Sequence, residues 1–273
     1  MSVDEHTIEL AGSPAFYRTA PAPGVPALYV HGVPTSSDDW ISFLERSGGI
    51  APDLIGFGRS GKGGNLDYTI GGLTDFLERL LEHLGIDRVK LVVHDWGAAV
   101  GLAFAQRNPE RIERIVVIDG VPVFPAQGIR WHRLARLWVR PWIGELVMGA
   151  TTRAMLARVL RSGSTDPNAW PDTRIASIWT QFDQGTQRAI LRLYRAADES
   201  ELARTGAALD RLEAAALIVW GEADPWLPVT VGETYAAVLP HSSLDRVENA
   251  GHWPWLDSPG VVDRVASFLE DAA

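Results

Sequence analysis

The chain has 273 residues, of which 46% are hydrophobic, so it is long enough to bury one sizeable core. Its formal net charge of −9 argues against nucleic acid or an anionic membrane as a partner. Because it has no cysteine, disulfides, thiolate metal sites and cysteine nucleophiles are excluded. The acidic opening segment has no apolar run and no stretch is long enough for a membrane span, so we expect a soluble, cytoplasmic protein.

Short apolar segments bounded by turn residues predict strands, in chain order at residues 27–30, 89–93, 114–118, 216–220 and 244–247. Such segments are typical of a mostly parallel sheet that is covered by helices. Between them, residues 73–85 carry a leucine stripe at helical spacing, and small residues from Gly97 predict a helix that stops before Pro109. The alternation of strands and helices predicts a doubly wound α/β fold.

Residues 121–212 break this alternation, because they contain helical stretches rich in tryptophan and arginine and no convincing strand. We interpret them as a helical lid that is inserted between two strands of the sheet. The remaining residues, 1–120 and 213–273, would then form the core domain. Whether the chain forms a homodimer is left open.

The segment LVVHDWGAAVG at 91–101 predicts a strand, a sharp turn at Asp95 and a helix. That order is typical of a nucleophile elbow, in which one side chain is held at the tip of a tight turn. No G-x-S-x-G motif occurs in the chain, and Asp95 stands where the serine would be. An isolated aspartate before a helix is usually an N-cap, so a catalytic interpretation depends on further motifs in the right order.

The first of these motifs, His31-Gly32-Val33-Pro34, directly follows the strand at 27–30. It resembles the oxyanion loop of α/β-hydrolases, in which the backbone N–H groups of Val33 and Trp96 would form the oxyanion hole.

The second and third motifs follow the last two predicted strands. Asp224 comes after the strand at 216–220 and His252 after the strand at 244–247, so the chain order is nucleophile, acid, base. Asp119, which follows the strand at 114–118, is a rival for the role of the acid, and we favour Asp224.

Together the motifs resemble the α/β-hydrolase superfamily over nearly the whole chain, specifically its aspartate-nucleophile branch of epoxide hydrolases and haloalkane dehalogenases. A carboxylate that attacks a saturated carbon leaves an ester, which water can hydrolyse. The resemblance implies that His252, held by Asp224, activates this water. No metal or organic cofactor is expected, because the histidine and aspartates fall at triad spacing.

Two reactions fit an aspartate nucleophile. Tyr194, followed by arginine, resembles the lid pair with which epoxide hydrolases protonate the epoxide oxygen, and we favour epoxide hydrolysis. It is the only tyrosine between residues 121 and 212, where the family usually has two. The second proton donor could be either His132 or a tryptophan, and the sequence does not decide between them.

The alternative reaction is haloalkane dehalogenation, with Trp96 as a halide donor. Val93 and the H-G-x-P-T-S-S stretch are more like dehalogenases, although Val33 replaces the asparagine that many of them use as second donor. A lid tryptophan, at position 131, 138 or 142, could replace that asparagine. An esterase or a non-catalytic ligand-binding protein on this fold ranks lower.

The expected substrate is a small apolar or aromatic epoxide, or a haloalkane, together with water. We expect the pocket to be lined by His31, Pro34, Trp96, His132, Trp138 and Trp179. His94 is expected to pack or to form local hydrogen bonds.

Overall fold

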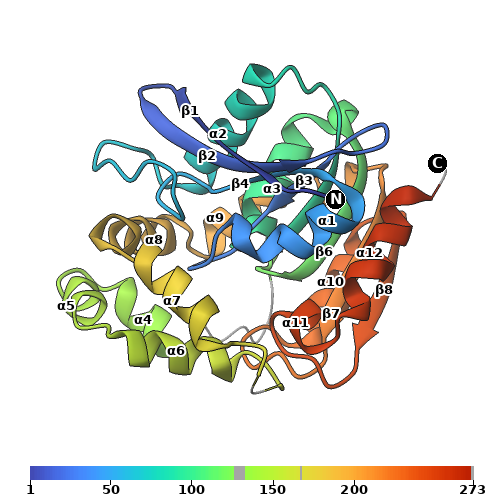
Figure 1. Cartoon of the computed structure of the whole chain (residues 1–273). Helices are drawn as coiled ribbons and strands as arrows, with labels where there is room; N and C mark the ends of the chain where they lie inside the picture. The colour runs from blue at the N-terminus through green and yellow to red at the C-terminus, as the bar shows by residue number, and fades with distance from the viewer. Residues whose placement is uncertain (126–132, 167, 272–273) are drawn as a thin grey trace.

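The structure is a computed structural model of the chain, and it describes residues 1–125, 133–166 and 168–271. Its centre is an eight-stranded sheet with the strand order β1-β2-β4-β3-β5-β6-β7-β8 (Figure 1). The strands are β1 (Asp4–Leu10), β2 (Ser13–Ala20), β3 (Ala27–Val30), β4 (Gly49–Pro52), β5 (Val89–Asp95), β6 (Ile112–Gly120), β7 (Ala215–Gly221) and β8 (Ser242–Val247). Strand β2 runs antiparallel to both β1 and β4, and the pairs from β4 to β8 are parallel.

All five strands expected from the sequence are present, as β3 and β5 to β8, and the doubly wound α/β fold is confirmed. The sequence did not predict β1, β2 and β4. Strand β1 lies at the sheet edge with much of its surface in solvent, so it lacks an apolar run. Strand β4 is only four residues long, and it begins with glycine and ends with proline. These two residue types are typical of turns, so the sequence did not indicate a strand here.

Helices α1 (Ile41–Ser47) and α12 (Gly260–Glu270) pack together, as do α2 (Ile70–His83) and α3 (Trp96–Arg107). The leucine stripe of α2 is buried, and Thr69 caps the helix by accepting from the N–H of Gly72. Helix α3 ends at Arg107, before Pro109, as predicted. The other elements outside the lid segment are the 3-10 helices η1 (Ser37–Trp40) and η2 (Pro109–Arg111), with α10 (Val229–Val238) and α11 (Pro254–Asp257).

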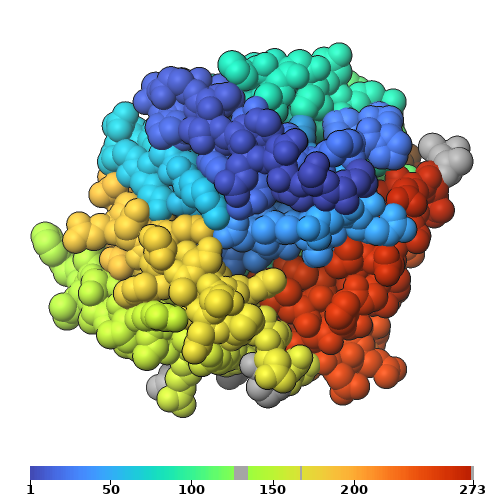
Figure 2. Space-filling view, viewed as in Figure 1, coloured from blue at the N-terminus to red at the C-terminus, as the bar shows by residue number. Residues whose placement is uncertain are grey.

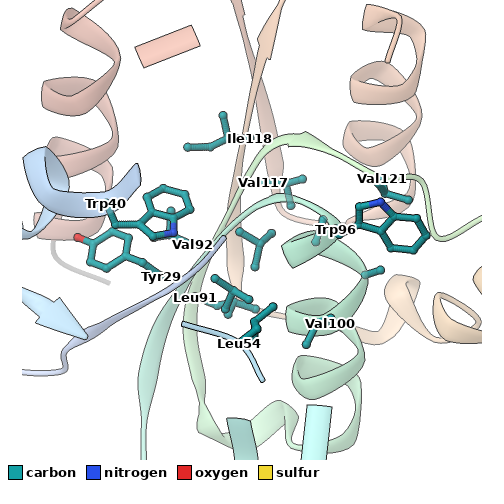
Figure 3. Close-up of a cluster of buried hydrophobic side chains, with 14 of the residues drawn as sticks. Tyr29, Trp40, Leu54, Leu91, Val92, Trp96, Val100, Val117, Ile118 and Val121 are labelled. Atoms are coloured by element: carbon teal, nitrogen blue, oxygen red, sulfur yellow. The ribbon is translucent and has the colours of Figure 1, made fainter. Parts of the chain in front are cut away.

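The core gathers around the two central strands. Figure 3 shows Val92 of β5 and Val117 of β6 between Tyr29 and Trp40 on one side and Trp96 on the other. All five side chains are at most 1% exposed. Burial of a large apolar side chain of this kind contributes roughly 1.5–3 kcal/mol, so this packing fixes the two strands that carry the site.

Residues 121–212, which we call the lid segment, connect β6 to β7. Their described part contains helices and no strand: α4 (Arg133–Trp138), α5 (Ile143–Gly149), α6 (Arg153–Ser162), α7 (Asp172–Gln181), α8 (Gln184–Ala196), α9 (Glu199–Thr205) and η3 (Leu209–Arg211). Figure 2 shows most of the lid segment as one block at the lower left, against the N-terminal part of the chain. Among the described residues, no helix is both long and apolar enough to cross a membrane.

Polar contacts fasten the lid segment to the rest of the chain. The Lys62 ammonium donates to the carbonyl oxygen of Gln181 at 2.7 Å and pairs with Asp183 at 3.0 Å. On the same side, the Asp38 carboxylate accepts hydrogen bonds from Ser177 and Gln181 of α7 at 3.0 and 3.2 Å. Helices α7 and α8 are therefore held against the loops that follow β3 and β4.

Candidate active site

Asp95 lies at the tight turn between β5 and α3, with the backbone angles φ 50° and ψ −124°. A non-glycine residue with positive φ costs roughly 1–2 kcal/mol, which the surrounding packing must offset. Two glycines make the turn possible. A Cβ on Gly97 would lie 2.2 Å from the carbonyl oxygen of Val30, and a Cβ on Gly32 would lie 2.5 Å from Asp95 Oδ2. The carboxylate is thereby held against the loop that follows β3.

Two backbone N–H groups hold this carboxylate. The N–H of Val33 donates to Asp95 Oδ2 at 2.9 Å, and the N–H of Trp96 also bonds the carboxyl group. Burial raises the pKa of Asp95, and the charge of His252 and the two N–H groups oppose that effect without cancelling it. The two N–H groups that the sequence proposed as an oxyanion hole therefore converge on the Asp95 carboxyl.

His252 joins Asp95 to Asp224. Its Nδ1 lies 2.7 Å from Asp224 Oδ2, and its Nε2 lies 3.8 Å from Asp95 Oδ1. The other Asp224 oxygen accepts the N–H groups of Trp226 and Leu227 at 2.7 and 3.0 Å. With Nδ1–H donating to Asp224, Nε2 is the nitrogen that can accept a proton.

The charge of His252 is set by its two carboxylate neighbours. Burial lowers the pKa of His252, but the charge and hydrogen bond of Asp224, together with the charge of Asp95, outweigh it and leave the pKa raised. The imidazolium form is therefore stabilised between two acids, as a general base requires when it takes a proton.

Asp119 lies next to Asp224, at the end of β6. Its oxygens accept the N–H of Gly221 at 3.1 and 3.3 Å, and the side chain is fully buried. Burial and the negative charge of Asp224 raise the pKa of Asp119 well above its usual range, and the two carboxyl groups are hydrogen bonded. Asp119 is thus the protonated partner that donates to Asp224, whereas Asp224 is the acid that contacts His252 Nδ1.

Two other histidines from the motifs have backbone partners. His94 Nε2 donates to the carbonyl oxygen of His252 at 2.8 Å, and the two rings pack with centroids 4.7 Å apart. Burial lowers the pKa of His94 well below its usual range, so this ring is neutral. His94 therefore packs and hydrogen-bonds next to the site, although its partner is far away in the sequence.

His31 is fully buried beneath the oxyanion loop. Its Nδ1 donates to the carbonyl oxygen of Gly32 at 2.7 Å, and its Nε2 accepts the N–H of Leu54 at 2.9 Å. Contrary to the expectation from the sequence, His31 does not reach the cavity wall, because both ring nitrogens are taken by backbone groups that shape the loop.

A cavity of about 110 Å³ lies between Asp95 and the lid segment. Most of its lining is apolar. It comprises Val33, Pro34, Asp95, Trp96, Val121, Trp138, Val147, Thr151, Met155, Leu156, Val159, Leu160, Phe182, Ile190, Tyr194, Trp226, Leu227, His252 and Trp253.

Of the predicted pocket residues, Pro34, Trp96 and Trp138 line this cavity, and Trp179 does not. Trp179 stacks on Phe182, and the Phe182 ring lines the cavity in its stead. His132 lies outside the described residues. The apolar lining from α5 and α6 was not predicted, because the sequence of an amphipathic helix does not say what its apolar face contacts.

Tyr194, on α8, presents its ring to the same cavity. It packs against Trp96 with ring centroids 4.7 Å apart and meets Trp138 edge-on at 5.2 Å. Burial and the charge of Asp95 raise the pKa of Tyr194 far above its usual value, and a hydrogen bond from Trp96 only partly opposes this. The phenol therefore keeps its proton at neutral pH.

Comparisons with known proteins place the chain among hydrolases of one fold family. A family model described as the alpha/beta hydrolase fold matches residues 26–259. A haloalkane dehalogenase from Mycolicibacterium paratuberculosis is 32% identical over 269 residues, which cover 92% of this chain and 85% of that protein. Epoxide hydrolase 1 from Caenorhabditis elegans is 24% identical, over 89% of this chain and 64% of that protein.

A solved structure shares the architecture over nearly the full length. The crystal structure of the haloalkane dehalogenase DbeA from Bradyrhizobium elkani superimposes with a TM-score of 0.85 and 24% identity, and covers 98% of both chains. At 24% identity, this match shows a shared fold alone.

Proposed function

We propose a reaction for this chain, which belongs to the α/β-hydrolase superfamily and, within it, to the branch of haloalkane dehalogenases and epoxide hydrolases. It opens a small apolar epoxide to a vicinal diol, through an ester with Asp95. The observation that carries the proposal is Tyr194, a protonated phenol on the cavity wall within reach of the charge of Asp95.

In the first step Asp95 Oδ1 attacks an epoxide carbon. The C–O bond of the ring breaks, and the departing alkoxide takes the proton of the Tyr194 hydroxyl. Proton donation is needed because an alkoxide is a strong base and a poor leaving group. Oδ2 stays with the N–H of Val33 and becomes the carbonyl oxygen of the ester. Because its pKa is raised, the Tyr194 hydroxyl stays protonated and can donate.

In the second step His252 Nε2 takes a proton from a water, which attacks Cγ of Asp95. The negative charge that develops on Oδ2 is stabilised by the N–H groups of Val33 and Trp96. Collapse of this intermediate breaks the bond between Cγ and Oδ1 of the ester. The diol leaves with the proton from His252, and the second proton of the water stays on the Asp95 carboxyl. Loss of that proton to solvent restores the Asp95 carboxylate, and the Tyr194 phenolate takes up one proton from solvent, so the cycle closes.

The cavity wall supports an apolar substrate. Few of its lining residues are polar, and Trp138, Phe182 and Leu156 are typical of the rest. A styrene-type or short alkyl epoxide would bury its carbon skeleton there and expose only the reacting ring to polar groups.

Dehalogenation is the second candidate, because two tryptophans of the cavity wall, Trp96 and Trp138, contact the same tyrosine ring. Indole N–H groups can stabilise a departing halide, which needs no proton. The 32% identical relative that is named a haloalkane dehalogenase supports the same reaction.

A pair of variants separates the two reactions. Tyr194→Phe should lower diol formation from styrene oxide by about 10²–10⁴-fold, the range for loss of a general acid, and leave any bromide release from a bromoalkane unchanged. Tyr29→Phe is the matched control, since Tyr29 is a buried phenol that donates to the carbonyl oxygen of Gly48 and does not line the cavity. Bromide release without any diol from the parent protein would overturn the choice.

Isotope labelling tests the ester itself. In a single turnover in H₂¹⁸O with enzyme in excess, the label should appear in the Asp95 carboxyl, found by peptide mass spectrometry, and not in the product. Direct attack of water would label the product instead. His252→Gln should accumulate the ester, seen as an enzyme mass increased by one substrate.

A further inference from the structure

An exposed apolar surface lies on the lid segment, around the turn from α4 to α5. Trp142 is 87% exposed and Leu146 is 74% exposed, with Val139 and Ile143 beside them in the sequence. Among the described residues, the large apolar side chains that are exposed all fall between Val139 and Met155, apart from Met1. We call Val139, Trp142, Ile143 and Leu146 the lid patch. Contiguous exposed apolar surface of this kind on a protein usually has a partner.

The turn that carries the lid patch is held from the inside by Arg195. Its guanidinium donates to the carbonyl oxygens of Trp138 and Arg140 at 3.1 and 3.2 Å and pairs with Glu145 at 2.7 Å. Trp142 has φ 66°, a strained value for a residue with a side chain. The polar atoms of the turn thus face Arg195, and the apolar side chains are presented outward.

The segment that carries the lid patch is rich in arginine. Residues 133–162 contain six arginines and one acidic residue, Glu145, which gives a net charge of +5 in a chain whose net charge is −9. Arg136, Arg140 and Arg158 are exposed, and no ion pair joins them to another described residue. Glu145, in contrast, is neutralised by Arg195.

Helix α5, which carries Ile143 and Leu146 of the lid patch, also reaches the cavity. Val147 of α5 lines the cavity, as does Met155 of the next helix, α6. Met155 is also 46% exposed, so its side chain connects the cavity wall to the outer surface. In Figure 1, α5 and α6 lie at the outer edge of the lid segment, away from the sheet.

We infer that the lid patch docks on an anionic phospholipid surface. Apolar side chains that include a tryptophan would enter the interfacial zone, and the arginines around them would contact lipid phosphates. A second copy of the chain fits less well, because a symmetric contact would bring these arginines against the same arginines of the other copy. The net charge of −9, which argued against an anionic membrane as a partner, does not describe the local charge of this segment.

Docking in this way would place the cavity next to the phase in which apolar molecules concentrate. That link to substrate supply rests on the proposed function, whereas binding to lipid does not. Vesicle binding measured without substrate therefore tests the inference even if the proposed reaction is wrong.

The experiment is co-sedimentation with vesicles of phosphatidylcholine, with and without phosphatidylglycerol. The parent protein should bind the mixed vesicles at low ionic strength, lose binding as salt is added, and bind pure phosphatidylcholine weakly. Trp142→Gln with Leu146→Gln, and separately Arg136→Gln with Arg140→Gln, should each lower the partition coefficient by about tenfold or more. Arg79→Gln with Arg88→Gln, on α2 and the loop after it, removes the same charge elsewhere and should bind as the parent does.

Three outcomes would overturn the inference. One is no binding of the parent protein to the mixed vesicles, and another is equal loss in the Arg79 and Arg88 control. The third is a parent dimer, seen by light scattering, that becomes a monomer in the Trp142 and Leu146 variant, which would make the lid patch a contact between copies. Unchanged thermal unfolding and unchanged turnover of a water-soluble substrate establish that the variants are folded.

Discussion

At the scale of single residues, the site has three acids with different hydrogen-bond partners. Asp95 is held by N–H groups, Asp224 by two N–H groups and His252, and Asp119 by one N–H group and its neighbour Asp224. Two carboxyl groups in hydrogen-bond contact cannot both ionise without a large cost. Asp119, which has the poorer set of donors, is the one that keeps a proton.

Replacement of the two acids should therefore have unequal effects. Asp119→Asn keeps a donor toward Asp224, so kcat should stay within about threefold of the parent, while Asp119→Ala leaves a buried acceptor short of a partner and should cost about 1–3 kcal/mol of stability. Asp224→Asn should lower the ester-hydrolysis rate by about 10³–10⁴-fold, since it removes the charge that stabilises the imidazolium. Stopped-flow measurement of both steps checks this. If Asp119→Asn lowered the ester-hydrolysis rate more than Asp224→Asn does, Asp119 would be the acid that supports His252.

The pH dependence of turnover follows from His252 and Tyr194. In the proposed reaction, His252 is neutral when it takes a proton from water. Because its pKa is raised, kcat should fall as the pH drops through a value above 6.5. Tyr194 must be protonated, and its raised pKa predicts no loss from this residue as the pH rises to about 10. A kcat profile over pH 5–10 tests both. An alkaline limb below pH 9 that disappears in Tyr194→Phe would contradict the second part.

At the scale of elements, Asp257 joins the lid segment to the loop that carries His252. Its Oδ2 accepts the N–H of Gly251 at 2.7 Å and of Thr165 at 3.1 Å, and its Oδ1 accepts the N–H of Asp166 at 3.0 Å. In addition, the N–H of His252 donates to the carbonyl oxygen of Gly163. The base is therefore positioned partly by the lid segment, whereas Asp95 is positioned by β5 and α3.

This division predicts that Asp257→Ala slows one step only. Ester hydrolysis should slow by about tenfold or more because His252 loses its support, and formation of the ester should stay near the parent rate. The unfolding free energy should fall by about 1.5–3 kcal/mol for the lost charged hydrogen bonds. Ester accumulation in rapid-quench mass spectrometry is the readout. Asp263→Ala, at an exposed acid on α12, is the control, and an equal loss in both steps would contradict the assignment.

At the scale of the whole molecule, folding also buries Asp39 at a cost. Asp39 is 5% exposed, and burial raises the pKa of Asp39 to about 6, although hydrogen bonds from Thr35 and Trp253 oppose this effect. Between its unfolded value, roughly 3.9, and 6 the folded state binds more protons, so stability falls as the pH rises through this window and stays lower above it.

Asp39→Asn should accordingly stabilise the protein at pH 7.5, by about 1–3 kcal/mol, and should change little near pH 4. Denaturant unfolding at the two pH values measures this. Asp87→Asn, at an exposed acid, should stay within about 0.5 kcal/mol of the parent at both. An equal gain at pH 4 would mean that the charge of Asp39 is not the cause.

The sequence by itself determined the fold class and the order of the motifs. The strands β3 and β5 to β7 are largely apolar segments with turn residues around them, whereas β8 is mostly polar. The order Asp95, Asp224, His252 follows from the strand that each residue ends or follows. Strands β1 and β4 were not predicted because edge exposure in β1 and shortness in β4 remove the periodic signal. Strand β2, which is eight residues long and mostly buried, was also not predicted.

Only the tertiary structure decided which side chains meet. It brought Asp224 to His252 Nδ1 and left Asp119 behind it, turned His31 toward the backbone, and put Tyr194 on the cavity wall between neighbours from β5–α3 and from α4. It also left Trp142 and Leu146 of the arginine-rich segment exposed. The reason is the same throughout: a helical or strand pattern fixes which face of an element is apolar, and only packing between distant elements fixes what that face contacts.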